Sequence, residues 1–158
     1  IIIIILMLKK FISHRGNLYE KDLNRENKIE SIFEVISMGY DCEVDLRYID
    51  GKIFLGHDSP NQEIEISIIS EIKESIWIHC KNLAMLNYFV SLEDADINYF
   101  WHQNDDFTLT SKNYIWTYPG KDISKNSVIV DLNHKYKIED EIFGLCSDNI
   151  HYAKDLYS

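Results

Sequence analysis

Residues 42–58, CEVDLRYIDGKIFLGHD, hold the pattern from which the rest of the chain can be interpreted. The Asp50-Gly51 pair in the middle is a strong signal for the tight turn of a β-hairpin. Side chains alternate between the two faces of a strand, so Glu43 and Asp45 share one face and their apolar neighbours share the other. The sequence therefore predicts a hairpin whose first strand carries two carboxylates side by side.

This carboxylate pair has two interpretations. Two like charges on one face repel each other, so the pair is costly unless a cation or a proton compensates for it. The second strand ends in Gly56-His57-Asp58, which brings an imidazole to the same region. A cation site beside a titratable histidine is typical of hydrolases. Taken alone, however, the pattern fits a solvated, acidic hairpin face better.

The residues before the hairpin predict a strand, a polar loop and a helix. Residues 11–13 are apolar and lead into HRGN at 14–17, which is the pattern of a loop at the carboxyl end of a strand. On its own, His14 is equally well interpreted as a surface loop residue. From 26 to 38, apolar residues recur at helical spacing, and Gly39 is a suitable stop.

The residues after the hairpin continue this alternation. Residues 64–72 predict a short amphipathic helix, 75–81 a strand and 82–92 another helix. On that strand, His79 and Lys81 share a face and repeat the two-residue spacing of the carboxylate pair.

The second half of the chain is poorer in helices. Short strands are predicted at 98–102, 107–110, 114–118, 127–131 and 145–148, with one or two helical turns at 138–143. No linker or internal repeat divides the chain, so we expect a single domain over residues 1–158.

Composition narrows the function classes. The formal net charge of −10 and the lack of a basic run argue against a nucleic-acid partner. Three cysteines without a Cys-x-x-Cys pair indicate reduced thiols and a cytoplasmic protein rather than a disulfide framework or a structural zinc site. The apolar run 1–8 is too short for a transmembrane segment; it is either a first buried strand or sequence upstream of a natural start at Met7. Oligomeric state is left open.

Four short motifs of this chain resemble those of the glycerophosphodiester phosphodiesterase family, within the phospholipase C-like phosphodiesterase TIM barrels, and they occur in the same order as in that family. His-Arg-Gly follows the first strand, Glu-Asn opens a helix, Glu-x-Asp is a carboxylate pair, and His-Asp is a second histidine motif. They lie at residues 14–16, 26–27, 43–45 and 57–58. The resemblance fades after residue 58.

The resemblance and the βα alternation together predict an α/β fold: a small, reduced TIM-like (β/α) barrel with helices mainly in the first half. A full barrel takes about 250 residues, which is more than this chain has. The chain also departs from the family on the third strand, where His79-x-Lys81 replaces the family's Glu-x-Lys. An imidazole therefore stands where the resemblance implies a metal-binding carboxylate.

The resemblance implies a role for each motif residue. Glu43 and Asp45 would bind a divalent cation, with His79 and Glu26 as further ligands or supporting contacts. Mg²⁺ or Ca²⁺ suits the carboxylates best, while His79 shifts the preference toward Mn²⁺ or Zn²⁺. The catalytic acid–base pair would be His14 and His57. Substrate phosphate would be neutralised by Arg15 and Lys81.

The expected function is therefore metal-dependent cleavage of a small glycerophosphodiester-type phosphodiester. Two alternatives stay open: a weak or inactive relative that binds a phosphorylated ligand, and a metal-dependent hydrolase of another substrate class. We expect six side chains to line one pocket at the carboxyl ends of the strands: His14, Glu43, Asp45, His57, His79 and Lys81. Further wall residues could come from later strand ends, at His102, Asn104, Trp116, Tyr118, Asp131 and Asp148.

Overall fold

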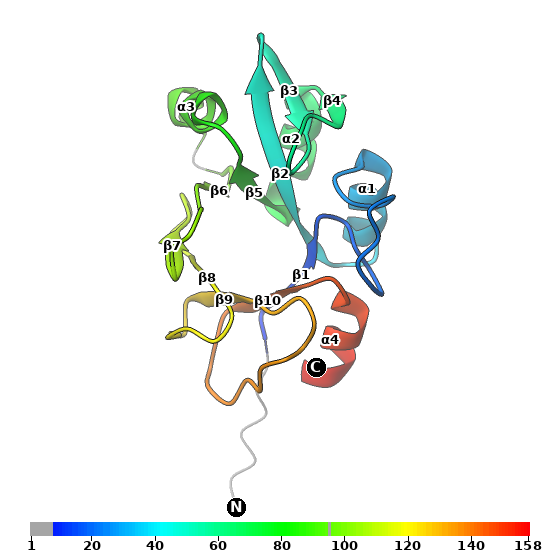
Figure 1. The fold of residues 1–158 in the computed structure, drawn as a ribbon, viewed down its shortest axis with the longest axis vertical. Coiled ribbons are helices and arrows are strands. Elements are labelled where there is room, and N and C mark those ends of the chain that lie inside the picture. The colour runs from blue at the N-terminus through cyan, green and yellow to red at the C-terminus, as the bar shows by residue number, and fades with distance from the viewer. Residues whose placement is uncertain (1–7, 95) are drawn as a thin grey trace, which may run out of the picture.

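A computed structural model describes residues 8–94 and 96–158, and one strongly curled sheet dominates it (Figure 1). The apolar run 1–8 lies almost wholly outside the described residues. Within these ranges the strands are β1 (Lys10–His14), β2 (Asp41–Ile49), β3 (Lys52–Leu55), β4 (Gln62–Ile64), β5 (Ile76–Cys80), β6 (Tyr99–Phe100), β7 (Phe107–Leu109), β8 (Ile115–Thr117), β9 (Ser127–Val130) and β10 (Gly144–Ser147).

Short helices flank this sheet. Figure 1 shows α1 and α4 outside the curl beside β1 and β10, while α3 lies outside it near β6. The described helices are α1 (Ile29–Ser37), α2 (Ile66–Ile72), α3 (Leu83–Leu92) and α4 (Ile150–Tyr157), with a 3₁₀ turn, η1 (Lys73–Ser75). They run from seven to ten residues, well short of the roughly 20 that a bilayer crossing takes.

The sheet is mixed. The strands β6, β5, β2, β1, β10, β9 and β8 pair in this order, and every pair is parallel. The strands β3, β4 and β7 join by antiparallel pairing. The long strand β2 takes part in both patterns: its first half pairs with β1 and β5, and its second half forms the predicted hairpin with β3. Asp50 and Gly51 both have positive φ, at 50° and 80°, as the tight hairpin turn requires.

The predicted TIM-like (β/α) barrel is wrong. The structure is a sheet-dominated, curled half-barrel with only four short α-helices in the described residues. The parallel strands β8, β9 and β10 are joined by loops instead of helices, so that side of the sheet lacks the outer helical layer of a (β/α) barrel. The described α-helices are also not concentrated in the first half: α1 and α2 lie there, α3 and α4 lie in the second half, and α4, which follows the last strand, was not predicted.

One of the connecting loops also explains the missing helical turn at 138–143. The Asp131 carboxylate accepts hydrogen bonds from the backbone N–H groups of Lys135 and Tyr136, which fixes an irregular loop. This loop contains Ile138 and Ile142, whose side chains are buried although the loop is not helical. Their apolar spacing thus reflects burial of a loop, not of a helix.

Two groups of apolar side chains fill the two faces of the sheet. The main core includes Val44 and Leu46 of β2, together with side chains of α1 and α3. The opposite face carries a smaller aromatic cluster: Ile12, Trp77, Phe100, Trp116, Val128 and Cys146. Glu43 and Asp45 face this second side, as the alternation along β2 predicted.

The two ends of the curl meet through β6 and β8. Phe100 stacks on Trp116 with ring centroids 4.8 Å apart. The backbone N–H of Ser111 donates to the Tyr99 carbonyl at 2.8 Å, and Tyr99 N–H donates to the Ser111 hydroxyl at 2.9 Å. These contacts bring the segment before β8 against β6 although the two strands do not pair.

The three cysteines are free, buried thiols on three different strands: Cys42 on β2, Cys80 on β5 and Cys146 on β10. Burial raises the pKa of each thiol, to about 12 for Cys80, so the thiol form is strongly favoured.

Candidate functional site

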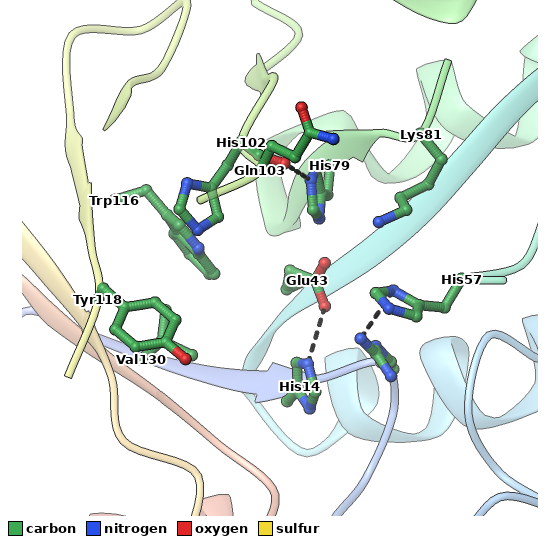
Figure 2. A pocket seen from close by; sticks show the side chains of 11 residues that line it. His14, Glu43, His57, His79, Lys81, His102, Gln103, Trp116, Tyr118 and Val130 are labelled. Carbon is green, nitrogen blue, oxygen red and sulfur yellow. Dashed lines mark hydrogen bonds and ion pairs between the residues drawn. The ribbon is translucent and has the colours of Figure 1, made fainter. Parts of the chain in front are cut away.

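A pocket of about 440 Å³ opens at the carboxyl ends of the parallel strands (Figure 2). Of the six residues expected to converge, five line it and Asp45 lies beneath, contacting His57 and His79. The lining residues are His14, Arg15, Glu43, His57, His79, Lys81, His102, Gln103, Trp116, Tyr118 and Val130.

The carboxylate pair and His79 form one cluster of potential metal ligands. Each residue places one ligand atom within 4.8 Å of the others. The parallel register sets Asp45 opposite His79 on neighbouring strands, so the two-residue spacings on β2 and β5 meet on one face. The cluster therefore matches three of the four predicted metal ligands, while Glu26 lies outside it.

Glu43 has an unsatisfied buried oxygen. The side chain is 3% exposed, and no described donor hydrogen-bonds its Oε2 atom. The nearest counter-group is Nε2 of His14, at 3.9 Å (Figure 2). Burial, followed by repulsion from Asp45, raises the pKa of Glu43 well above its usual range, against the opposing charges of Arg15 and Lys81. A bound cation would supply the missing partner.

Asp45 is fully buried, but protein donors surround it. Oδ2 accepts from the Asn27 amide at 2.9 Å and lies 3.0 Å from Nε of Arg15. Oδ1 lies 3.2 Å from Nδ1 of His57 and 3.3 Å from Nδ1 of His79. Burial alone would raise the pKa of Asp45, but the histidine contacts and the Arg15 charge outweigh it and hold that pKa well below its usual range.

A backbone carbonyl orients His79. Its Nε2 lies 2.9 Å from the carbonyl oxygen of His102, and because a carbonyl only accepts, this nitrogen carries a proton. In the neutral ring, Nδ1 is then a lone pair that faces Asp45. Nδ1 of His79 and Oδ1 of Asp45 would then both be acceptors, 3.3 Å apart, and such a contact is favourable only if a cation or a second ring proton lies between them. A ligand histidine whose other nitrogen donates to a carbonyl is the usual arrangement at metal sites.

His14 is oriented from behind by Asp148. Its Nδ1 atom lies 2.6 Å from Oδ1 of Asp148, so a proton resides on Nδ1 and the Nε2 lone pair is free toward the pocket. Burial opposes ionisation of Asp148, but the hydrogen bond from His14 and a further one from Asn17 keep the pKa of Asp148 below its ordinary value.

Arg15 and His57 meet across the pocket floor. Nδ1 of His57 lies 2.7 Å from NH2 of Arg15 and 3.2 Å from Oδ1 of Asp45. Arg15 only donates and Asp45 only accepts, so the two contacts favour opposite tautomers of the neutral ring. Arg15 has φ of 58°, in the left-handed region, and this turn directs its guanidinium toward Asp45 and Glu26. Gly56 has φ of 150°, which positions His57 at the end of the hairpin.

The opposite wall is largely aromatic and carries no acidic side chain. It consists of Gln103, Trp116, Tyr118, Val130 and His102, while Lys81 lies on the charged side with His57 (Figure 2). Burial, followed by the nearby His79 and Lys81, lowers the pKa of His102 and favours its neutral form.

Sequence reasoning named some wall residues and missed others. It named three lining residues, His102, Trp116 and Tyr118, and the orienting residue Asp148. Asn104 instead borders an adjoining hollow of about 250 Å³, and Asp131 holds its own loop. Gln103 and Val130 were missed because nothing in their local pattern distinguishes them. Asn27 was noted only as part of the Glu-Asn motif, not as a partner of Asp45.

No family model, curated protein or solved structure matches this chain. The resemblance to glycerophosphodiester phosphodiesterases therefore stays a prediction that rests on the residues themselves.

Proposed function

We propose that this protein is a metal-dependent phosphodiesterase that cleaves a small, glycerophosphodiester-type phosphodiester by histidine acid–base catalysis. The observation that carries the proposal is one pocket with three parts: the Glu43–Asp45–His79 cluster, the two imidazoles of His14 and His57, and the cations Arg15 and Lys81. Each part matches one need of phosphodiester cleavage.

The cluster would hold the divalent cation. Mg²⁺ and Ca²⁺ suit the two carboxylates, and Mn²⁺ or Zn²⁺ suits the imidazole better. When bound, the cation would neutralise charge on a phosphoryl oxygen. The unpartnered Oε2 of Glu43 and the lone pair of His79 support this assignment.

The proton positions divide the acid–base roles. Asp148 holds a proton on Nδ1 of His14, so Nε2 of His14 is the base that removes a proton from the attacking hydroxyl. In the tautomer of His57 whose Nδ1 accepts from Arg15, Nε2 carries the proton that would pass to the leaving alkoxide. The attacking hydroxyl would be a neighbouring group of the substrate, which forms a cyclic phosphate first. Lys81 and Arg15 neutralise the phosphate.

Turnover of glycerophosphocholine, whose glycerol hydroxyl can attack phosphorus and whose choline leaves as an alkoxide, tests the proposal. We expect release of choline that EDTA abolishes and that added Mg²⁺ or Mn²⁺ restores. His14→Gln and His57→Gln should each lower kcat by about a hundredfold or more, whereas His151→Gln, at an exposed histidine distant in sequence, should not. A panel that includes a phosphomonoester and a carboxylic ester separates this activity from a hydrolase of another class. No turnover at any metal concentration would contradict the proposal.

A second candidate is a protein that binds a phosphorylated ligand without turnover. The contacts of Asn27 and Arg15 with Oδ2 of Asp45 favour it, because these two groups compete with a cation for that oxygen. Calorimetric binding of inorganic phosphate that requires Arg15 and Lys81, without phosphodiesterase activity, would support this candidate over the first. For either function we propose a cytoplasmic location, in keeping with three free thiols.

A further inference from the structure

Asn17 is a fully buried polar side chain that belongs to none of the roles assigned above. Its amide nitrogen donates to Oδ1 of Asp148 at 2.9 Å and to Oε1 of Glu26 at 3.1 Å. Its amide oxygen accepts from the backbone N–H of Asp22 at 3.0 Å, which fixes the direction in which the amide points. Every hydrogen of this amide group is thus directed at a carboxylate.

The two carboxylates need such a donor. Glu26 and Asp148 are 8% and 4% exposed, and an oxygen of each lies within 4.8 Å of the other and of a His14 nitrogen. Buried like charges at this distance repel strongly. Asparagine gives each of them one N–H and adds no charge of its own, which neither aspartate nor an apolar residue could do.

Each carboxylate in turn orients a proposed catalytic group. Asp148 accepts from Nδ1 of His14 at 2.6 Å, and Oε2 of Glu26 accepts from NH1 of Arg15 at 3.2 Å. Asn17 is therefore the link between the partner of the base and the partner of the phosphate-binding arginine. The backbone supports this position, since the Ser13 hydroxyl donates to the Asn17 carbonyl at 2.6 Å.

We propose that Asn17 is a positioning residue that fixes the His14 ring and the Arg15 guanidinium together, through Asp148 and Glu26. Its effect on catalysis rests on the proposed function, whereas its effect on the two side chains does not. In this arrangement Glu26 acts by holding Arg15 and not as a metal ligand.

The test compares Asn17→Asp, which keeps the shape but removes both donors, with Asn17→Ser, which keeps one donor. The exposed Asn24→Asp in the same loop is the control for the added charge. Nitrogen-15 NMR of the histidine rings reports the proton on Nδ1 of His14, assigned by its loss in His14→Gln. We expect Asn17→Asp to lose or shift that signal and to lower kcat about a hundredfold. Asn17→Ser should show a smaller change and Asn24→Asp none.

Two outcomes would overturn the inference: a folded Asn17→Asp with the parent's His14 signal, or one with the parent's kcat. If Asn17→Asp does not fold, Asn17→Ser carries the same two measurements. If the parent itself shows no phosphodiesterase turnover, the proposed function fails, and the NMR signal alone decides the role of Asn17.

Discussion

Glu43 and Asp45 lie two residues apart on β2, yet their surroundings shift their pKa values in opposite directions. Asp45 is buried among donors, so its ionised form is favoured. Glu43 is buried beside Asp45 with an oxygen that no described group hydrogen-bonds, so its ionised form is disfavoured. The difference lies in the partners that the fold supplies, because the burial of the two is nearly equal.

Opposite stability effects follow for the two carboxylates in metal-free protein. Glu43→Gln should raise the free energy of unfolding at neutral pH, because Glu43 is ionised in the unfolded chain and burial disfavours that form, whereas Gln has no ionised form. Asp45→Asn should lower it by about 3 kcal/mol or more, because it removes one of the two buried carboxylates that pair with Arg15. Urea unfolding in EDTA measures both.

The pH dependence of these effects has a defined sign. The folded pKa of Glu43 is raised, so its favourable contribution is complete below the unfolded value of about 4.3 and is lost as pH rises through the folded pKa. The folded pKa of Asp45 is lowered, so its contribution is present above about 3.9 and is lost as pH falls through the folded pKa. The gain from Glu43→Gln should therefore vanish near pH 4. Effects of the same sign at pH 7.5 would contradict this account.

Metal preference should depend on His79. A neutral imidazole makes the cluster one charge more positive than three carboxylates would be, which weakens binding of hard cations. His79→Glu should therefore raise the affinity for Mg²⁺ or Ca²⁺ relative to Mn²⁺ or Zn²⁺. Calorimetric titration checks this, with His151→Glu, at an exposed histidine, as the charge control.

Removing either carboxylate of the pair tests whether the cluster binds metal at all. Glu43→Gln and Asp45→Asn should abolish metal binding, since each removes a ligand charge. A Glu43→Gln protein that binds metal as tightly as its parent would reduce the pair to an acidic hairpin face.

The site residues that could be predicted are those that carry a local motif. His14, Glu43, His57, His79 and Lys81 were expected to converge, and the structure places them around one pocket. Asn17 was missed because its importance depends on Asp148, which is 131 positions away in the sequence. Local spacing contains no information about such a partner.

At the scale of elements, the end of the hairpin depends on one glycine. Gly56 has φ of 150°, and a Cβ there would lie 1.9 Å from the Ser59 carbonyl oxygen. Gly56→Ala should therefore cost about 3 kcal/mol of stability. It should also displace His57 and lower kcat.

Gly39 is the matched control, because its φ is also positive, at 90°, but a Cβ there would meet nothing within 4 Å. Gly39→Ala should cost about 1 kcal/mol from backbone strain alone and leave kcat unchanged. Thermal unfolding and turnover compare the two variants, and equal losses would argue against the clash at Gly56.

The elements could be predicted where one pattern dominates. Alternation gave β2, β3 and β5, and helical spacing gave α1 and α3 within a few residues. The helix α4 was missed although it has a signal: the Asn149 side chain caps it by accepting from the Tyr152 N–H, and Ile150 and Ala153 are its buried residues. The turn at 138–143 was wrong because Asp131 fixes a loop from outside that window.

At the scale of the whole molecule, the contact between the two ends of the curl is mostly aromatic. Phe100 is 2% exposed and stacks on both Trp116 and His79. Phe100→Ala should cost about 3–5 kcal/mol and weaken metal binding, because His79 loses the ring that supports it. Phe107→Ala, at a side chain that is 53% exposed on β7, should cost far less. Denaturant unfolding distinguishes the two.

The overall architecture could not be derived from the parts that were predicted correctly. Strand–helix alternation in the first half suggested a (β/α) barrel, but a barrel needs helices of sufficient length after nearly every strand. In the later part of the chain, β8 and β9 are followed by loops instead of helices, and side chains such as Asp131 hold these loops in place. Parallel pairing of seven strands thus does not imply the helical layer.

The free thiols on β2, β5 and β10 can be used to measure how the sheet opens. A thiol-reactive reagent can modify Cys42, Cys80 or Cys146 only when the strand that carries it separates from the sheet. Mass spectrometry of a timed labelling reaction would therefore resolve the exposure of each strand. Equal rates at all three sites would mean that the curl opens as one cooperative unit. Faster labelling of Cys80 would show that the margin next to β6 detaches first, exposing His79 before the remaining pocket residues.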